Sequence, residues 1–216
     1  MSIEYYICDT ETSGLNCGYH EISELSVIRY SDKVQLFKKL KCLYPKRASY
    51  DALRITNKTI NDLYFGEDRE KVVNTVNKLF ESDGKKPNGR CVVAYNATFD
   101  RRFIHSLWDK VGQKFEADLW LDPLQIMRDY AKQQNMGKVK LDLTSACNMF
   151  GIKKFAAHTA SGDSRRLYFL LKTIIEDLDI DLLQYIKSFP HKVDVNNLEN
   201  LIDDDLSILD GIELPF

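Results

Sequence analysis

Apolar and polar positions follow two different periods along this chain. Short apolar runs bounded by polar corners, typical of strands, cover about 3–8, 22–30, 34–44, 91–96 and 117–121. Apolar positions three and four residues apart, typical of amphipathic helices, cover about 51–64, 67–81, 99–111, 123–134, 141–150 and 162–177. Three consecutive strands followed by alternating helices and strands predict an α/β fold, with a mixed five-stranded sheet flanked by helices.

Acidic residues follow the first of these strands, in the sequence Asp9-Thr10-Glu11-Thr12-Ser13-Gly14-Leu15. Residues two apart on a strand point to the same face, so we expect the carboxylates of Asp9 and Glu11 to lie side by side at the strand end. A solvated strand end is the alternative explanation, and the chain contains a second Asp-x-Glu at Asp68 and Glu70. That second pair lies in a polar helical stretch, whereas the first lies between an apolar strand and a turn.

Another acid, Asp100, follows the strand at 91–96. The helical pattern that begins there places Asp100 in the first turn, where an Asp can simply complement the helix dipole. The neighbouring Phe99 suits a core position or a base-stacking platform. Asn96 could anchor this corner through its side-chain amide and so orient Asp100.

The third polar segment, His158-Thr159-Ala160-Ser161-Gly162-Asp163, precedes an apolar helical pattern. We expect Ser161 to be the N-cap, with Asp163 in the first turn and His158 on the preceding loop. Most single histidines are structural or solvated. Among the four histidines of the chain, only His158 has an Asp five positions later.

In this order, the three segments resemble the motifs of the DEDD exonuclease superfamily, in its His-type (DEDDh, DnaQ-like) branch. The segment 9–14 resembles the family pattern Asp-x-Glu-[Thr/Ser]-[Thr/Ser]-Gly, and 158–163 matches His-x-Ala-x-x-Asp. The segment 95–100 resembles His-Asn-x-x-Phe-Asp, with Tyr95 in place of the histidine. The Tyr-type branch has its tyrosine four residues before the last Asp, where this chain has Thr159. The resemblance extends from about Tyr5 to about Leu171.

This resemblance implies a ribonuclease H-like fold and a metal-dependent 3′–5′ exonuclease that releases nucleoside monophosphates from single-stranded or frayed 3′ ends of DNA. It implies that Asp9, Glu11 and Asp163 hold one Mg²⁺ or Mn²⁺ ion, that Asp9 and Asp100 hold a second, and that His158 is the general base. Hard carboxylate oxygens suit these ions. Two such ions can activate a water and stabilise the leaving 3′ oxygen.

The resemblance also implies substrate contacts by Thr12, Leu15, Asn96 and Phe103. Backbone groups near Thr12 would meet the 3′ hydroxyl, and Leu15 would wedge against the last bases, although Leu15 could equally be an ordinary apolar turn residue. Two alternatives remain open for the function. One is an exoribonuclease or oligoribonuclease of the same branch. The other, which the intact ligand set disfavours, is a non-catalytic nucleic-acid-binding or polymerase-associated module.

Charge is divided unevenly between the body and the C-terminal end of the chain. The whole chain has 30 basic and 32 acidic residues, a formal net charge of −2, and residues 176–216 hold eleven of the acids but only two lysines. Residues 1–175 therefore have a net charge of +7, which suits a polyanionic substrate. Basic residues that could contact phosphates, or could simply be a charged edge strand or solvated helix faces, are Lys38, Lys39, Lys41, Lys46, Arg47, Arg101, Arg102, Arg165 and Arg166.

We predict an exonuclease domain over residues 1–178 and an acidic helical extension or tail over 179–216. In the tail, residues 190–216 mix acids with aliphatics, so they either pack on the body or dock a partner. The chain has neither an 18-residue apolar run nor a signal pattern, and we expect a cytoplasmic protein without membrane contact. Its five cysteines lack CxxC spacing, which favours reduced thiols over a zinc site.

Overall fold

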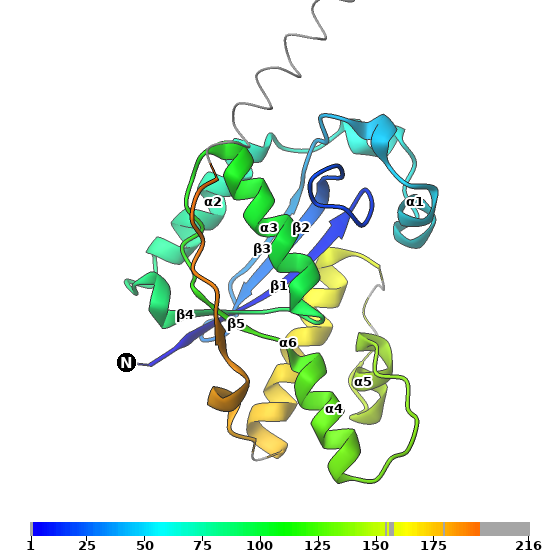
Figure 1. Cartoon of the computed structure of the whole chain (residues 1–216), viewed down its shortest axis with the longest axis vertical. Helices are drawn as coiled ribbons and strands as arrows, with labels where there is room; N and C mark the ends of the chain where they lie inside the picture. The colour runs from blue at the N-terminus through cyan, green and yellow to red at the C-terminus, as the bar shows by residue number, and fades with distance from the viewer. Residues whose placement is uncertain (1, 154, 156–157, 179, 195–216) are drawn as a thin grey trace, which may run out of the picture.

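A computed structural model of the chain describes residues 2–153, 155, 158–178 and 180–194 (Figure 1). Its centre is one six-stranded mixed sheet of order β3-β2-β1-β4-β5-β6. The first strand is central, because it pairs antiparallel with β2 and parallel with β4. The strands are β1 (Glu4–Thr12), β2 (Ile22–Arg29), β3 (Gln35–Lys39), β4 (Arg90–Val93), β5 (Leu119–Leu121) and β6 (Lys187–Ser188).

Helices cover both faces of this sheet (Figure 1). Alternate residues of β1 enter different cores, as its period of two requires. Tyr6 and Cys8 pack with α2 (Arg69–Glu81) and α3 (Ala97–Val111). Ile7 packs on the other face with α4 (Pro123–Gln133), α5 (Leu143–Met149) and α6 (Ala160–Asp177). The remaining elements are α1 (Tyr50–Thr56) and the short turns η1 (Pro45–Arg47), η2 (Asn61–Tyr64), η3 (Pro87–Gly89) and η4 (Leu182–Tyr185).

Two predicted elements end five or more residues before their patterns indicated. The helix predicted over 51–64 ends at Thr56, because Asn57 adopts the left-handed conformation with a φ of 53° and asparagine tolerates that conformation as a helix terminator. The strand predicted over 34–44 ends at Lys39. Beyond it, the N–H of Leu40 donates to the carbonyl of Ser23 on β2 at 2.9 Å, and Leu40 forms an isolated parallel bridge with Glu67.

Residues 180–194, which the sequence assigned to the C-terminal extension, pack on the body of the protein. The two-residue strand β6 pairs antiparallel with β5 and adds the sixth, unpredicted strand. The N–H of Phe189 donates to the carbonyl of Asp118 at 2.7 Å, and the Arg101 guanidinium lies 3.5 Å from the centre of the Phe189 ring. Residues 195–216 lie outside the described residues, so the partner docking predicted for 190–216 stays a prediction for most of that segment.

The described part of the chain contains no helix that combines the length and apolarity needed to cross a membrane. All five cysteines are free thiols, and every one except Cys17 is buried. The buried thiols therefore serve as small core side chains.

His105 makes the stability of this fold sensitive to acid. Its ring lies 4.6 Å from the ring of His191. Burial, with the positive charges of His191 and Arg101, lowers the pKa of His105 to about 3, from an ordinary value of 6.5. The unfolded chain therefore binds the proton more readily, and the stabilisation by neutral His105 is complete above pH 6.5 and is lost as the pH falls toward 3.

We expect the free energy of unfolding of His105→Gln, measured by urea denaturation, to fall less between pH 6.5 and pH 4 than that of the wild type. The exposed His158 offers a matched control, because His158→Gln should keep the wild-type pH dependence. An unchanged pH dependence in His105→Gln would contradict the assignment.

Candidate active site

The first acidic pair lies within β1 and not beyond its end, which corrects the strand predicted over 3–8. Pairing with β2 continues to Thr12, with Asp9 opposite Ser26 and Glu11 opposite Glu24. Strand alternation points Asp9 and Glu11 to the sheet face covered by α6. The two acids are therefore held by a central strand that stays paired with β2 at both positions, which fixes their separation more rigidly than a turn would.

The cap of α6 places Asp163 next to this strand. Thr159 is the N-cap, because its Oγ1 accepts a hydrogen bond from the N–H of Gly162 at 3.1 Å. This corrects the prediction of Ser161, which lies inside the first turn. Asp163 is in the first turn, as predicted.

Small side chains let this first turn of α6 approach the sheet closely. Ala160, Gly162 and Ser164 are buried, and the Ser164 hydroxyl lies 2.7 Å from that of Ser26 on β2. Because Ser26 is the cross-strand partner of Asp9, this contact brings Asp163 over Asp9.

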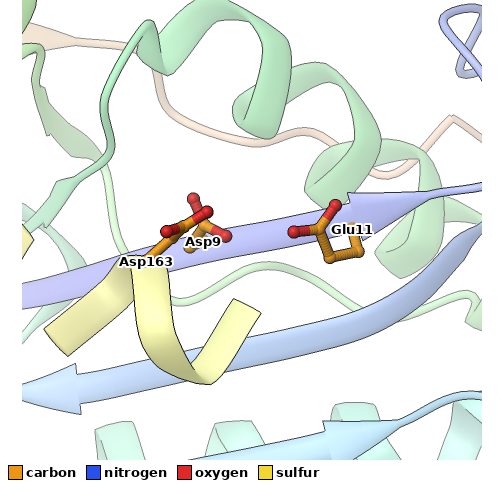
Figure 2. A group of neighbouring side chains, drawn as sticks. All are labelled: Asp9, Glu11 and Asp163. Carbon is orange, nitrogen blue, oxygen red and sulfur yellow. The ribbon is translucent and has the colours of Figure 1, made fainter. Parts of the chain in front are cut away.

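Asp9, Glu11 and Asp163 converge on one point (Figure 2). Each offers a carboxylate oxygen, and these oxygens lie within 4.8 Å of one another. Figure 2 shows Asp163 reaching from α6 toward Asp9, with Glu11 farther along the same strand. Hard oxygen donors at this spacing fit a divalent cation such as Mg²⁺ or Mn²⁺.

The electrostatics of the cluster favour a bound cation. Burial raises the pKa of Asp9 well above its usual range, and the charges of Asp100 and Glu11 raise it further. Burial also raises the pKa of Glu11 to about 7, with Lys58 acting in the opposite direction. These carboxylates therefore resist ionising together until a positive charge lies between them.

Asp100 contacts β1 at Thr10 and does not belong to the cluster of Asp9, Glu11 and Asp163. Its Oδ1 accepts hydrogen bonds from the backbone N–H of Thr10 at 3.0 Å and from the Thr10 hydroxyl at 2.8 Å. The edge of β1 is open there because the pairing of β1 with β4 ends at Ile7 opposite Val93. Burial raises the pKa of Asp100 to about 7, although the Thr10 hydrogen bonds lower it. The structure thus brings three of the four predicted ligands together and fixes the fourth beside them.

His158 lies on the loop before α6, as predicted, and its side chain is exposed. Its backbone is left-handed, with a φ of 58°, and its N–H donates to Asp163 Oδ2 at 3.3 Å. His158 also lines a cleft of about 560 Å³ together with Glu24 and Lys58. An imidazole is therefore available at the edge of the acidic cluster.

Glu24 is a fourth acid on the same face, and no motif in the sequence marked it. Glu24 is 4% exposed and is the cross-strand partner of Glu11. One of its oxygens lies 3.1 Å from Lys58 Nζ, and the other accepts from the N–H of Ala160 at 3.2 Å. The available signal was a Glu inside the apolar run 22–30, since a carboxylate in a buried strand needs partners.

Arg166 has a different role from the phosphate contact considered for it. Its side chain is buried and forms an ion pair with Asp163, and it donates to the hydroxyl of Thr144 at 2.8 Å. The guanidinium therefore neutralises and orients a predicted metal ligand. The signal was the spacing of three residues between Asp163 and Arg166, which places both side chains on one helix face.

Thr12, the last residue of β1, is buried, and Leu15, in the turn that follows, is exposed. Thr12 is 8% exposed, and its hydroxyl donates to the carbonyl of Gly14 at 2.7 Å. Leu15 is 80% exposed. A rigid turn with an apolar side chain in solvent is compatible with the predicted wedge, which stays a prediction.

The corner before α3 differs from the prediction in two ways. Asn96 has a φ of 64°, and its backbone N–H, rather than its side-chain amide, supports the corner by donating to Asp122 Oδ1 at 2.9 Å. Phe103 is 3% exposed and packs in the core, against Phe99 with ring centres 4.9 Å apart. Phe103 is buried because the apolar stripe of α3 faces the sheet. This burial is at odds with the direct substrate contact predicted for Phe103.

No protein-family model and no curated protein match this sequence. Solved structures of nucleases share its fold. E. coli Exonuclease I in complex with a dT13 oligonucleotide has a TM-score of 0.68 at 18% identity, and the match covers 81% of this chain and 41% of that chain. The zinc-bound form of the E. coli ExoI–ssDNA complex has a TM-score of 0.69 at 17% identity, covering 86% and 43%. Cell-death related nuclease 4 (CRN-4) has a TM-score of 0.68 at 11% identity, covering 88% and 67%. This chain spans about two fifths of the Exonuclease I chains, and it has their ribonuclease H-like fold, as predicted.

Proposed function

We propose that this protein is a metal-dependent 3′–5′ exonuclease that releases nucleoside 5′-monophosphates from single-stranded or frayed 3′ ends of DNA. The observation behind the proposal is the convergence of Asp9, Glu11 and Asp163 at the centre of an Exonuclease I-like sheet. The dT13 oligonucleotide in the E. coli Exonuclease I complex supports single-stranded DNA as the substrate class.

In this proposal Asp9, Glu11 and Asp163 hold one Mg²⁺ or Mn²⁺ ion, and Asp9 and Asp100 hold the second. When bound, such ions lower the pKa of a coordinated water and stabilise charge on the leaving oxygen. The protein keeps the ligands ready for this task. Arg166 holds Asp163 through their ion pair, and Thr10 fixes Asp100 through two hydrogen bonds.

His158 then acts as the general base. Imidazoles titrate near neutral pH, so a neutral ring can accept the proton of the attacking water. The water oxygen forms a bond to phosphorus, the bond from phosphorus to the 3′ oxygen breaks, and a nucleoside 5′-monophosphate leaves. The position of His158 supports this role, since its N–H contacts Asp163 and its side chain is exposed to incoming substrate.

Digestion of 5′-labelled single-stranded DNA, duplex DNA and RNA tests this function, with Mg²⁺, with Mn²⁺ and with a chelator. We expect single-stranded DNA to shorten progressively from its 3′ end, with no shortening in the chelator. Faster digestion of RNA would instead favour an exoribonuclease of the same fold. Failure to digest any of the three substrates with either metal would refute the proposed function.

A further inference from the structure

The cleft beside His158 extends from the acidic cluster toward the outer edge of the sheet. Glu24 and His158 line it, as do Ile55 and Lys58, which lie at and just after the end of α1, and Lys39 and Phe65. Its volume of about 560 Å³ lies within the range of small-molecule sites and is enough for a nucleotide. The cleft is therefore continuous with the site that we propose to be catalytic.

Phe65 is exposed, although its backbone is firmly held. Its side chain is 73% exposed, yet Gly66 packs so closely on the preceding strand that an added Cβ would lie 2.6 Å from the carbonyl carbon of Leu40. The N–H of Glu67 donates to the carbonyl of Lys39 at 2.8 Å, and the Glu67 carboxylate pairs with Lys38 Nζ at 2.5 Å. An aromatic ring on a fixed backbone loses little conformational entropy on binding.

Two ammonium groups accompany this ring. Lys39 is exposed and forms no close ion pair among the described side chains, although its charge acts on the carboxylate of Asp62, which also lines the cleft. Lys58 is 14% exposed and lies 3.1 Å from Glu24, which keeps its charge at the inner end of the cleft. An aromatic face beside cations is the combination that binds unpaired bases and their phosphates in single-stranded nucleic acids.

We propose that Phe65 is a stacking platform for an unpaired base of the substrate strand, with Lys39 contacting an adjoining phosphate. This inference rests on the proposed function and adds a source of preference for single strands, because a base inside a duplex cannot offer its face to Phe65. The cleft reaches His158, and two lysines line it. Both features favour nucleic acid over a protein surface as the occupant.

Binding can be measured apart from cleavage in an Asp9→Asn background, using fluorescence anisotropy of a labelled single-stranded DNA 12-mer. Phe65→Ala should raise the Kd by about 5- to 150-fold, the usual effect of losing one stacked base, and Phe65→Trp should restore binding. Phe169→Ala is the matched control, because Phe169 is a 43% exposed aromatic residue on α6 outside this cleft. Lys39→Gln should reduce the slope of log Kd against log salt by about 0.7, the value for one phosphate contact.

A DNA strand without bases tests whether the change in Kd is due to stacking on Phe65. On that strand Phe65→Ala should bind as well as its Asp9→Asn parent. An unchanged Kd for the normal strand, or an equal loss on the abasic strand, would overturn the role of Phe65 and leave the proposed function intact. If the wild type neither binds nor digests any single strand, both fail.

Discussion

Asp9→Asn is expected to abolish metal-dependent hydrolysis and, in the same protein, to raise the Tm measured without metal. Asp9 is the ligand that both proposed cations share, so its loss removes both from their working positions. In the metal-free protein, burial and the neighbouring acids disfavour the ionised Asp9 carboxylate. Asn has nearly the same shape without the charge. Relief of this repulsion should raise the Tm, by about 2–4 °C for each kcal/mol relieved in a chain of this size.

The test combines two measurements on one preparation. Digestion of 5′-labelled single-stranded DNA reports hydrolysis, and thermal denaturation in chelator and then in Mn²⁺ reports stability. Added Mn²⁺ should raise the Tm of the wild type by mass action and leave that of Asp9→Asn almost unchanged. Asp68→Asn is the matched control, because Asp68 belongs to the exposed second Asp-x-Glu and should keep both activity and the response to Mn²⁺. Residual Mn²⁺-dependent digestion by Asp9→Asn, or a lower Tm in chelator, would contradict the metal assignment.

Local patterns predicted the parts of this fold that depend on near neighbours. The period of two placed Asp9 and Glu11 on one face, because strand geometry alone decides that. The first turn of α6 was predicted through its cap, and the error of two residues in the cap left Asp163 in the right turn, since Thr159 and Ser161 can both accept a capping hydrogen bond. The antiparallel neighbours β1, β2 and β3 also follow from sequence order, because consecutive strands tend to lie side by side.

The features that the sequence did not predict depend on strand pairing and contacts between residues far apart in the chain. Glu24 joins the acidic cluster only because β2 pairs with β1 in the register that sets it opposite Glu11. The strand β6 has two residues and both are exposed, so it has no apolar pattern to detect, and its position depends on the edge that β5 leaves open. Phe65 resembles an ordinary core residue in sequence. In the fold its side chain is 73% exposed, which no local pattern indicates.

Loss of the His158 imidazole is expected to slow turnover by roughly 10²–10⁴-fold, the usual contribution of general acid–base catalysis, with little change in metal affinity. His158→Asn is the sharper variant beside His158→Ala, because asparagine tolerates the left-handed backbone of this position, where φ is 58°. The N–H that contacts Asp163 is also retained, so the ligand cluster keeps its geometry while the ring is lost. Single-turnover rates at saturating Mn²⁺ and one fixed pH should show this loss of rate in both variants, and titration with Mn²⁺ should give them the affinity of the wild type. Wild-type turnover in His158→Asn would exclude the ring from proton transfer, whereas slow turnover with weakened Mn²⁺ binding would point to damage at Asp163.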